Sequence, residues 1–182
     1  MTKIITDFLS LLTVLALVFS ALLLLDLILG ILTKRSSGII PKRMASAIRA
    51  QTVPYITLIA TIAMAGSLYF SDIAGYAPCK LCWLQRIAMY PLVVLGLVGI
   101  SRRDNGAIIY ITPLAIIGGL IAAYHYYHQI LPNLSIPCST VGYSVSCSER
   151  FFMTYGFVTI PMMALAAFGF ILSLIIYSKR KA

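Results

Sequence analysis

Charged side chains are scarce in this sequence, and negative charge is the scarcest. Charged residues make up 10% of the chain, with five Asp and Glu against fourteen Lys and Arg, whereas about 25% is usual in soluble domains. Because 60% of the residues are hydrophobic, so little charge excludes an ordinary soluble protein. We therefore expect an all-α integral membrane protein.

The positive charge does not indicate a nucleic-acid-binding protein, although the formal net charge is +9. Lys and Arg residues stand in short clusters between apolar runs, which is how membrane proteins set their orientation. The sequence shows no internal repeat, low-complexity tract or soluble domain. What it contains instead is long apolar runs and four cysteines.

Five apolar runs are candidates to cross a bilayer, for which a helix needs about 20 residues. They cover residues 4–32, 53–70, 82–100, 107–127 and 152–177. The first is far longer than the roughly 7–15 apolar residues of a signal peptide, so we expect it to remain as a helix. Asp26, near the end of this run, is expected either to lie at the membrane interface or to face a neighbouring helix.

The basic clusters predict the orientation of the chain. They lie in residues 33–52, 101–106 and 179–181. By the positive-inside rule these segments face the cytoplasm, and the segments near residues 72–78 and 128–151, which carry little net charge, face outward with all four cysteines. Five spans then place the N-terminus outside, which Lys3 fits poorly.

The first cysteine pair forms a Cys-x-x-Cys motif at the start of the third run. Cys79 and Cys82 are spaced so that their sulfurs can join in a disulfide that opens and closes. The N-terminus of the helix that begins near Cys82 favours its thiolate, because the helix dipole and free N–H groups supply positive potential. Lys80 and Arg86 add positive charge. Inert packing residues or a static disulfide are the alternatives.

Arg86 follows Cys82 by one helical turn and lies on the same face of the helix. An arginine inside a membrane span is costly and is usually functional. With Gln85 it could hold a carbonyl ligand at the membrane edge, and a quinone fits, because its ring accepts electrons while its tail stays in lipid. The alternative is an arginine that extends to the interface or pairs with a lipid phosphate.

The second cysteine pair lies in the larger outer segment. Eight residues separate Cys138 from Cys147, and Gly142 and several serines make the segment pliable. Such a loop could carry a disulfide to a soluble partner and swing back, while a static loop disulfide is the alternative. A four-thiolate zinc site is disfavoured, because the spacing of this pair suits zinc badly, and we predict no metal.

Two histidines stand three residues apart near the outer end of the fourth run. On a helix His125 and His128 fall on one face, so they could be metal or haem ligands, or proton carriers near a quinone. Two histidines on one helix cannot ligate one haem from both sides. Because three tyrosines accompany them, we favour membership of an aromatic belt at the membrane interface, with no assigned function.

The stretch CKLCWLQR, residues 79–86, resembles the Cys-x-x-Cys-x-x-x-Arg signature of the DsbB/BdbC family of membrane thiol–disulfide oxidoreductases. A second cysteine pair falls in the next outward loop, as in that family, and YGFVTIPMMALAAF resembles the start of the family's last helix. The resemblance covers roughly residues 52–177. Vitamin K epoxide reductases, which have a related fold, carry their loop cysteines before the Cys-x-x-Cys, the reverse of the order here.

The resemblance implies a four-helix bundle that reoxidises a thioredoxin-fold, DsbA/BdbD-like partner outside the membrane and passes the electrons to ubiquinone or menaquinone. The partner would attack Cys138, Cys147 would relay to Cys79, and Cys82 would be the quinone-proximal thiolate, with Arg86 binding the quinone. The outer-loop pair is closer in sequence than in the longer-looped DsbB members and is nearer the compact BdbC-like type.

This interpretation divides the chain into four parts. They are an extra N-terminal transmembrane helix at residues 1–33, a basic cytoplasmic loop at 34–52, a DsbB-like bundle at 53–177 and a cytoplasmic tail at 178–182. The rival hypothesis is a membrane structural or assembly subunit, or a transporter, whose cysteines form static bridges.

Overall fold

A computed structural model describes residues 2–33, 40–131, 147 and 149–179. Its helices are α1 (Thr2–Leu32), α2 (Lys42–Ala50), α3 (Thr52–Leu68), a π-helical turn η1 (Tyr69–Ile73), α4 (Lys80–Arg102), α5 (Ala107–Ile130) and α6 (Ile160–Lys179). Within the described residues, α1, α3 with η1, α4, α5 and α6 are long and apolar enough to cross a membrane. The prediction of an all-α membrane protein with five spans is confirmed.

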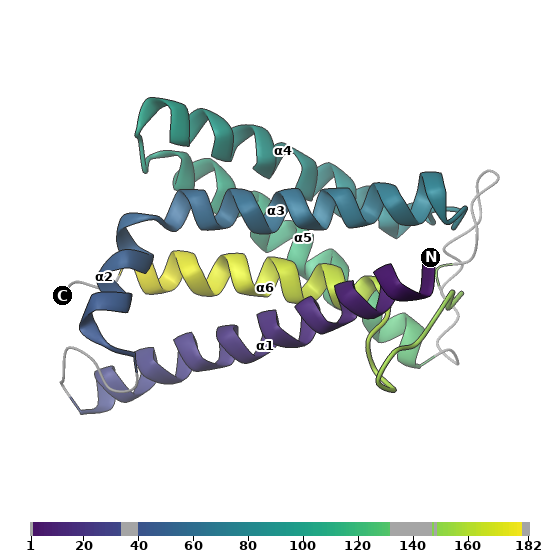
Figure 1. Ribbon diagram of the computed structural model, residues 1–182, viewed down its shortest axis with the longest axis horizontal. Coiled ribbons are helices and arrows are strands. Elements are labelled where there is room, and N and C mark those ends of the chain that lie inside the picture. Colours follow the sequence, from purple (N-terminus) through teal and green to yellow (C-terminus); the bar gives the residue numbers. More distant parts are fainter. Residues whose placement is uncertain (1, 34–39, 132–146, 148, 180–182) are drawn as a thin grey trace.

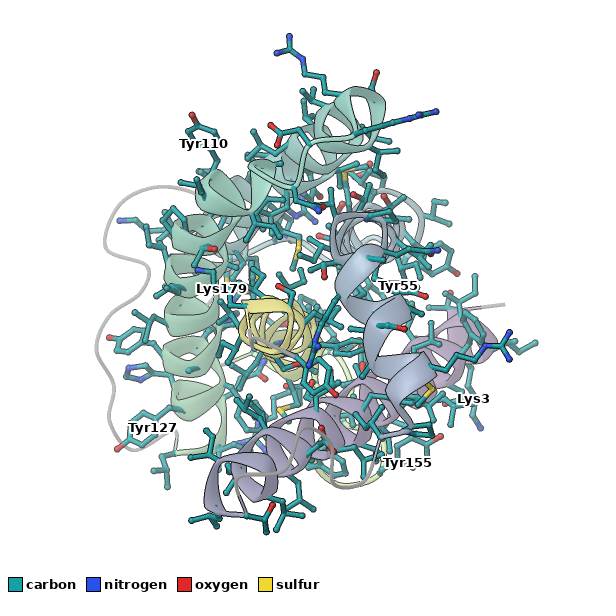
Figure 2. All side chains as sticks on the ribbon, turned by 90° about the vertical axis from the view of Figure 1, so that its left-hand side faces the viewer. Lys3, Tyr55, Tyr110, Tyr127, Tyr155 and Lys179 are labelled. Atoms are coloured by element: carbon teal, nitrogen blue, oxygen red, sulfur yellow. The ribbon has the colours of Figure 1, made fainter. Side chains whose placement is uncertain are left out.

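The five long helices run side by side, with α6 in the middle of the bundle (Figures 1 and 2). α6 packs against α1, α3 and α5, while α4 packs against α3 and α5. Phe168, Ile171 and Leu174 of α6 are buried, whereas Tyr110 and Tyr127 project from the outer side of α5 (Figure 2). The core therefore forms around α6, and the outer faces of the other helices are left for lipid.

Glycines allow the helices to approach closely. A Cβ atom at Gly118 of α5 would lie 2.2 Å from the ring of Phe168, and one at Gly96 of α4 would lie 2.1 Å from Thr57 Oγ1. Apolar burial gives helices little reason to associate in lipid, so such close packing is what holds them together.

Asp26 connects α1 to the rest of the bundle. Its carboxylate is completely buried; Oδ1 accepts the backbone N–H of Ile40 at 3.1 Å, and Oδ2 accepts the hydroxyl of Tyr177 at 3.0 Å. Tyr177 belongs to α6, so Asp26 faces a neighbouring helix, which decides between the two alternatives that the sequence left open.

Two segments differ from the predicted pattern. The basic segment contains the short helix α2, and the last helix begins at Ile160, eight residues later than the apolar run. Before α6 the chain turns through Tyr155 and Gly156, both with positive φ, and a β-bridge joins Thr154 to Val158. Positive φ is incompatible with a right-handed helix, and Pro161 fits the first helical turn that follows.

Candidate redox site

Cys79 caps the N-terminus of α4. Its backbone is extended, and its Sγ accepts the N–H of Cys82 at 3.3 Å. A side chain that takes one of the free N–H groups of the first turn stabilises the helix start, and here the acceptor is a sulfur. The sequence predicted that the helix N-terminus would favour a thiolate at Cys82, whereas the structure directs this N–H to Cys79.

The two sulfurs of the motif are neighbours. Cys79 Sγ and Cys82 Sγ lie 3.1 Å apart, and both residues are free thiols. The hydrogen bond from the Cys82 thiol lowers the pKa of Cys79 well below its usual value; burial opposes this shift, and the His125 ring acts in the same direction as Cys82. Cys79 is therefore the sulfur that carries the negative charge most readily when the pair is reduced.

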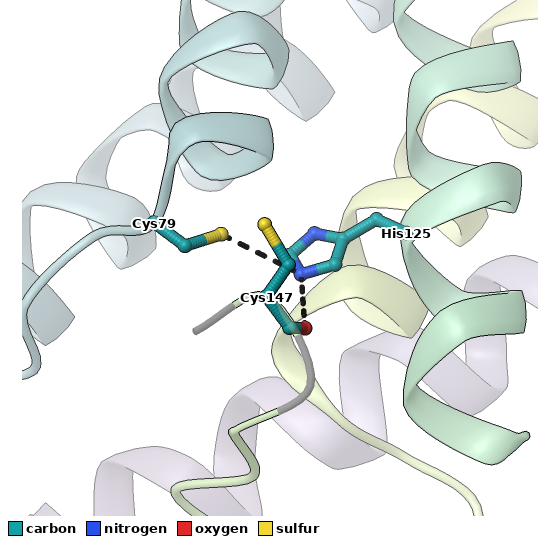
Figure 3. A group of neighbouring side chains, drawn as sticks. All are labelled: Cys79, His125 and Cys147. Atoms are coloured by element: carbon teal, nitrogen blue, oxygen red, sulfur yellow. Dashed lines mark hydrogen bonds between the residues drawn. The ribbon is translucent and has the colours of Figure 1, made fainter. Parts of the chain in front are cut away.

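His125 lies directly beside Cys79 (Figure 3). Its Nε2 is 3.6 Å from Cys79 Sγ and 3.2 Å from the carbonyl oxygen of Cys147, and its Nδ1 is 3.0 Å from Nε2 of Gln85. With 2% of its surface exposed, His125 is not part of an aromatic belt, so that interpretation is wrong for this residue. His128, which is also buried, makes edge contacts with Tyr124 and Tyr127, and its place in an aromatic belt stays a prediction.

Cys147, which belongs to the outer segment, also lies close to Cys79 and His125. It is disulfide-bonded, and its Sγ, Cys79 Sγ and a ring nitrogen of His125 all lie within 4.8 Å of one another. Cys138 lies outside the described residues. Three such ligand atoms could hold a metal ion, but a sulfur in a disulfide is not a thiolate ligand. The arrangement suits sulfur exchange between Cys147 and Cys79 better.

Arg86 is held against α3. Its Nε donates to the hydroxyl of Ser67 at 2.9 Å, one terminal nitrogen donates to the Ser67 carbonyl at 3.0 Å, and the guanidinium lies 5.2 Å from the centre of the Trp83 ring. Tyr90 also donates to the Ser67 hydroxyl. Sequence reasoning missed Ser67, because a serine in an apolar run gives no signal of which helix it will face.

A groove of about 690 Å³, which we call the apolar groove, lies between α1, α3, α4 and α6. Its walls include Leu12, Phe19, Ile59, Met89 and Phe170, and Cys82, Gln85 and Arg86 line it too. Cys79 does not line this groove; it lies with His125 in a smaller cavity beside it. Cys82 lines both the groove and this smaller cavity, so of the two motif cysteines it is the one that borders the groove.

Comparison with known proteins places these residues in a family context. The family model described as disulfide bond formation protein DsbB matches residues 49–178. Disulfide bond formation protein C of Bacillus subtilis (strain 168) is 45% identical over 113 residues, which cover 61% of this chain and 80% of that protein. The probable disulfide formation protein C of Halalkalibacterium halodurans is 44% identical over 125 residues, covering 68% of this chain and 90% of that protein. No solved structure matches this chain.

Proposed function

The chain belongs to the DsbB family of disulfide bond formation proteins, and from this premise we propose that it is a quinone-dependent protein disulfide oxidoreductase. In this proposal it reoxidises a thioredoxin-fold partner outside the membrane and passes the electrons to ubiquinone or menaquinone. The observation that carries the proposal is the placement of Cys79 between two sulfurs, with Cys82 at 3.1 Å and Cys147 within 4.8 Å.

The proposed exchange steps involve only the sulfur atoms of the partner and of the four cysteines, and each sulfur–sulfur bond that forms replaces one that breaks. A thiolate of the reduced partner attacks Cys138 and breaks the bond between Cys138 and Cys147. The partner's second thiol then resolves the mixed disulfide, so the partner leaves with a disulfide and the outer-loop pair is left as two thiols. The thiolate of Cys147 then attacks Cys79 in the Cys79–Cys82 disulfide, a Cys147–Cys79 bond forms, and Cys82 departs with the electron pair. Attack by Cys138 on Cys147 restores the outer-loop disulfide and releases Cys79. Each step is thiolate attack on a disulfide.

The apolar groove supports the quinone part of the proposal. A quinone accepts two electrons and two protons, and it would take them from the Cys79–Cys82 dithiol. Arg86 carries five N–H donors, of which two are used on Ser67, so its others can serve a carbonyl oxygen. Gln85 lines the groove as well, although its amide nitrogen also contacts His125. The apolar walls along α1 and α3 suit an isoprenoid tail.

The position of the Cys79–Cys82 pair at the start of a membrane span suits a quinone as the electron acceptor. A lipid-tailed quinone cannot leave the bilayer, so the last disulfide must form at its edge, and α4 begins at Lys80, one residue after Cys79. The proposed orientation keeps the cysteine end outside the cytoplasm and the C-terminus inside, in the cell membrane. This compartment is one in which disulfides persist.

The proposal is tested with the full-length protein in detergent. We expect quinone reduction to require both a reduced thioredoxin-fold partner and each of the four cysteines, so that single Cys→Ala variants lose turnover. The control is Ile73→Ala, which changes a side chain that is 73% exposed at the same end of the bundle and does not line the groove, and this variant should retain turnover. A structural subunit or a transporter with static bridges would reduce no quinone, with or without the reduced partner. Absence of quinone reduction by the unsubstituted protein would therefore refute the proposal.

A further inference from the structure

Two buried polar side chains that the sulfur relay described above does not use, Gln85 and His125, form a chain of contacts that ends on Cys79. Gln85 and His125 are 6% and 2% exposed, and they belong to α4 and α5, two different helices. Polar groups buried at this depth are costly unless they are hydrogen-bonded. Here the Gln85 amide contacts one ring nitrogen of His125, and the other ring nitrogen contacts the sulfur.

The contacts fix which nitrogen of the neutral ring carries the hydrogen. Nε2 of Gln85 is an amide nitrogen and can only donate, so Nδ1 of His125 accepts. The hydrogen of the neutral imidazole is then on Nε2. That N–H is directed at Cys79 Sγ and at the Cys147 carbonyl oxygen, 3.6 Å and 3.2 Å away.

We infer that His125 is a catalytic residue of the sulfur relay, acting as a neutral N–H donor to the charge on Cys79, and that Gln85 is the positioning residue that keeps the ring in this tautomer. The inference rests on the proposed function. When Cys138 attacks Cys147 in the Cys147–Cys79 intermediate, the Cys147–Cys79 bond breaks and Cys79 leaves with the electron pair. The His125 N–H receives this thiolate, and no proton is transferred.

This contact also favours electron flow from the outer-loop pair to the Cys79–Cys82 pair. Stabilising the reduced form of a dithiol raises its reduction potential, and His125 stabilises the Cys79 thiolate and not the disulfide. The Cys79–Cys82 pair therefore becomes a better electron acceptor for the outer-loop pair. Because the N–H is shared with the Cys147 carbonyl, the same donor also aligns the segment that delivers the attacking sulfur.

The test measures the Cys79–Cys82 equilibrium in glutathione buffers, without quinone. The full-length protein carries Cys138→Ser and Cys147→Ser, and thiols are trapped with a maleimide that changes gel mobility. We expect His125→Ala to lower the equilibrium constant for reduction about tenfold, equal to about 30 mV for a two-electron couple. Gln85→Leu should shift it in the same direction by less.

Two further variants separate the inference from a packing role. His125→Gln places an amide N–H where Nε2 lies and should restore most of the lost potential, since no charge or proton transfer is needed. His128→Gln removes a histidine three residues away on the same helix, and it should leave the potential unchanged.

An unchanged potential in a folded His125→Ala protein, or failure of His125→Gln to rescue, would overturn the inference. Because the assay contains neither quinone nor partner, its result is independent of whether the proposed function holds. A protein that reduces no quinone but shows these shifts would refute that function, and what would remain is His125 as the N–H donor that raises the reduction potential of the Cys79–Cys82 pair.

Discussion

At the scale of single residues, Arg86 is the side chain whose surroundings matter most for the proposed electron transfer. Its two contacts with Ser67 hold the planar guanidinium on the inner side of α4, and it lines the same groove as Cys82. An arginine fixed in this way pays little entropy when it binds a carbonyl group, because its orientation is already set.

Replacing Arg86 by Ala should raise the apparent KM for quinone while single-turnover disulfide exchange with the partner stays near normal. Hydrogen bonds to charged groups contribute about 1.5–3 kcal/mol, which corresponds to roughly 10- to 150-fold. Arg86→Lys keeps the charge but loses the planar fork, so it should be partly active. The measurement is quinone-dependent turnover beside stopped-flow exchange.

The control for this substitution is Arg102→Ala, which removes an exposed arginine from the other end of the same helix. It should leave both steps unchanged. Equal quinone kinetics in Arg86→Ala and in the unsubstituted protein, at normal expression, would contradict the predicted role and leave Arg86 as a structural contact with Ser67.

At this scale the sequence could predict contacts between residues that are close along the chain, but not contacts between residues of different helices. Cys79, Cys82 and Arg86 share one helix end, so helical periodicity alone places them together. Ser67 and His125 come from other helices, and whether they contact the motif depends on how those helices rotate in the bundle. His125 also stands among tyrosines, which made an interfacial position the natural expectation.

At the scale of elements, α1 is the helix that the family match does not reach. The match begins at residue 49, whereas α1 ends at Leu32 and packs against α6. Phe19 stacks near Phe170 with ring centres 6.4 Å apart, and both rings line the apolar groove. The helix therefore closes one side of a groove whose other walls belong to the family bundle.

Asp26→Leu should loosen the attachment of α1 and lower the thermal stability of the detergent-solubilised protein. The substitution removes the acceptor for the Ile40 N–H and the Tyr177 hydroxyl, and the loss of a hydrogen bond of this kind costs about 0.5–1.5 kcal/mol. For a chain of this size each kcal/mol lowers Tm by about 2–4 °C. Asp26→Asn keeps a carbonyl acceptor and should lose less.

Asp7→Leu is the matched control, since Asp7 is an exposed carboxylate on the same helix. Its Tm should stay within the error of the unsubstituted protein. If Asp26→Leu were equally stable, apolar packing alone would hold α1 in place, and the buried carboxylate would have no part in docking.

The ends of the elements show where sequence periodicity stops being informative. Residues 152–159 belong to the last apolar run, which predicted a helix. Tyr155 and Gly156 take positive φ instead, and the chain turns before α6. In α2, six of nine residues are Ala, Ile, Met or Ser, but this basic segment was interpreted from the sequence as a loop, and the helix was missed. Hydropathy locates membrane spans well, but it does not locate turns or short interfacial helices.

At the scale of the whole molecule, the three basic clusters and the cysteines lie at opposite ends of the bundle. The end that carries α2, the turn between α4 and α5 and the C-terminal end of α6 contains Arg43, Arg49, Arg102, Arg103 and Lys179. The opposite end contains the start of α4 (Figure 1), where Cys79 and Cys82 lie, and Cys147 lies close to Cys79. The clusters that the sequence scatters over three segments are thus gathered on one side, which strengthens the prediction that this end is cytoplasmic.

The predicted orientation is tested with single reporter cysteines in a background where the four native cysteines are serine. A cysteine replacing the exposed Ser46 of α2 should react with a membrane-impermeant maleimide only after the cells are permeabilised. One replacing the exposed Tyr155, at the opposite end, should react in intact cells. The reason is the cost of moving a cluster of Lys and Arg across the bilayer during insertion.

The opposite labelling pattern would contradict more than the topology. It would place the Cys79–Cys82 pair and Cys147 in the cytoplasm, where thioredoxin and glutathione keep thiols reduced. A disulfide relay facing that pool would be reduced continually by bystander thiols, and the quinone would drain electrons without forming disulfides in exported proteins. Labelling at Ser46 in intact cells, together with protection at Tyr155, would therefore refute the orientation and remove the physical basis of the proposed function.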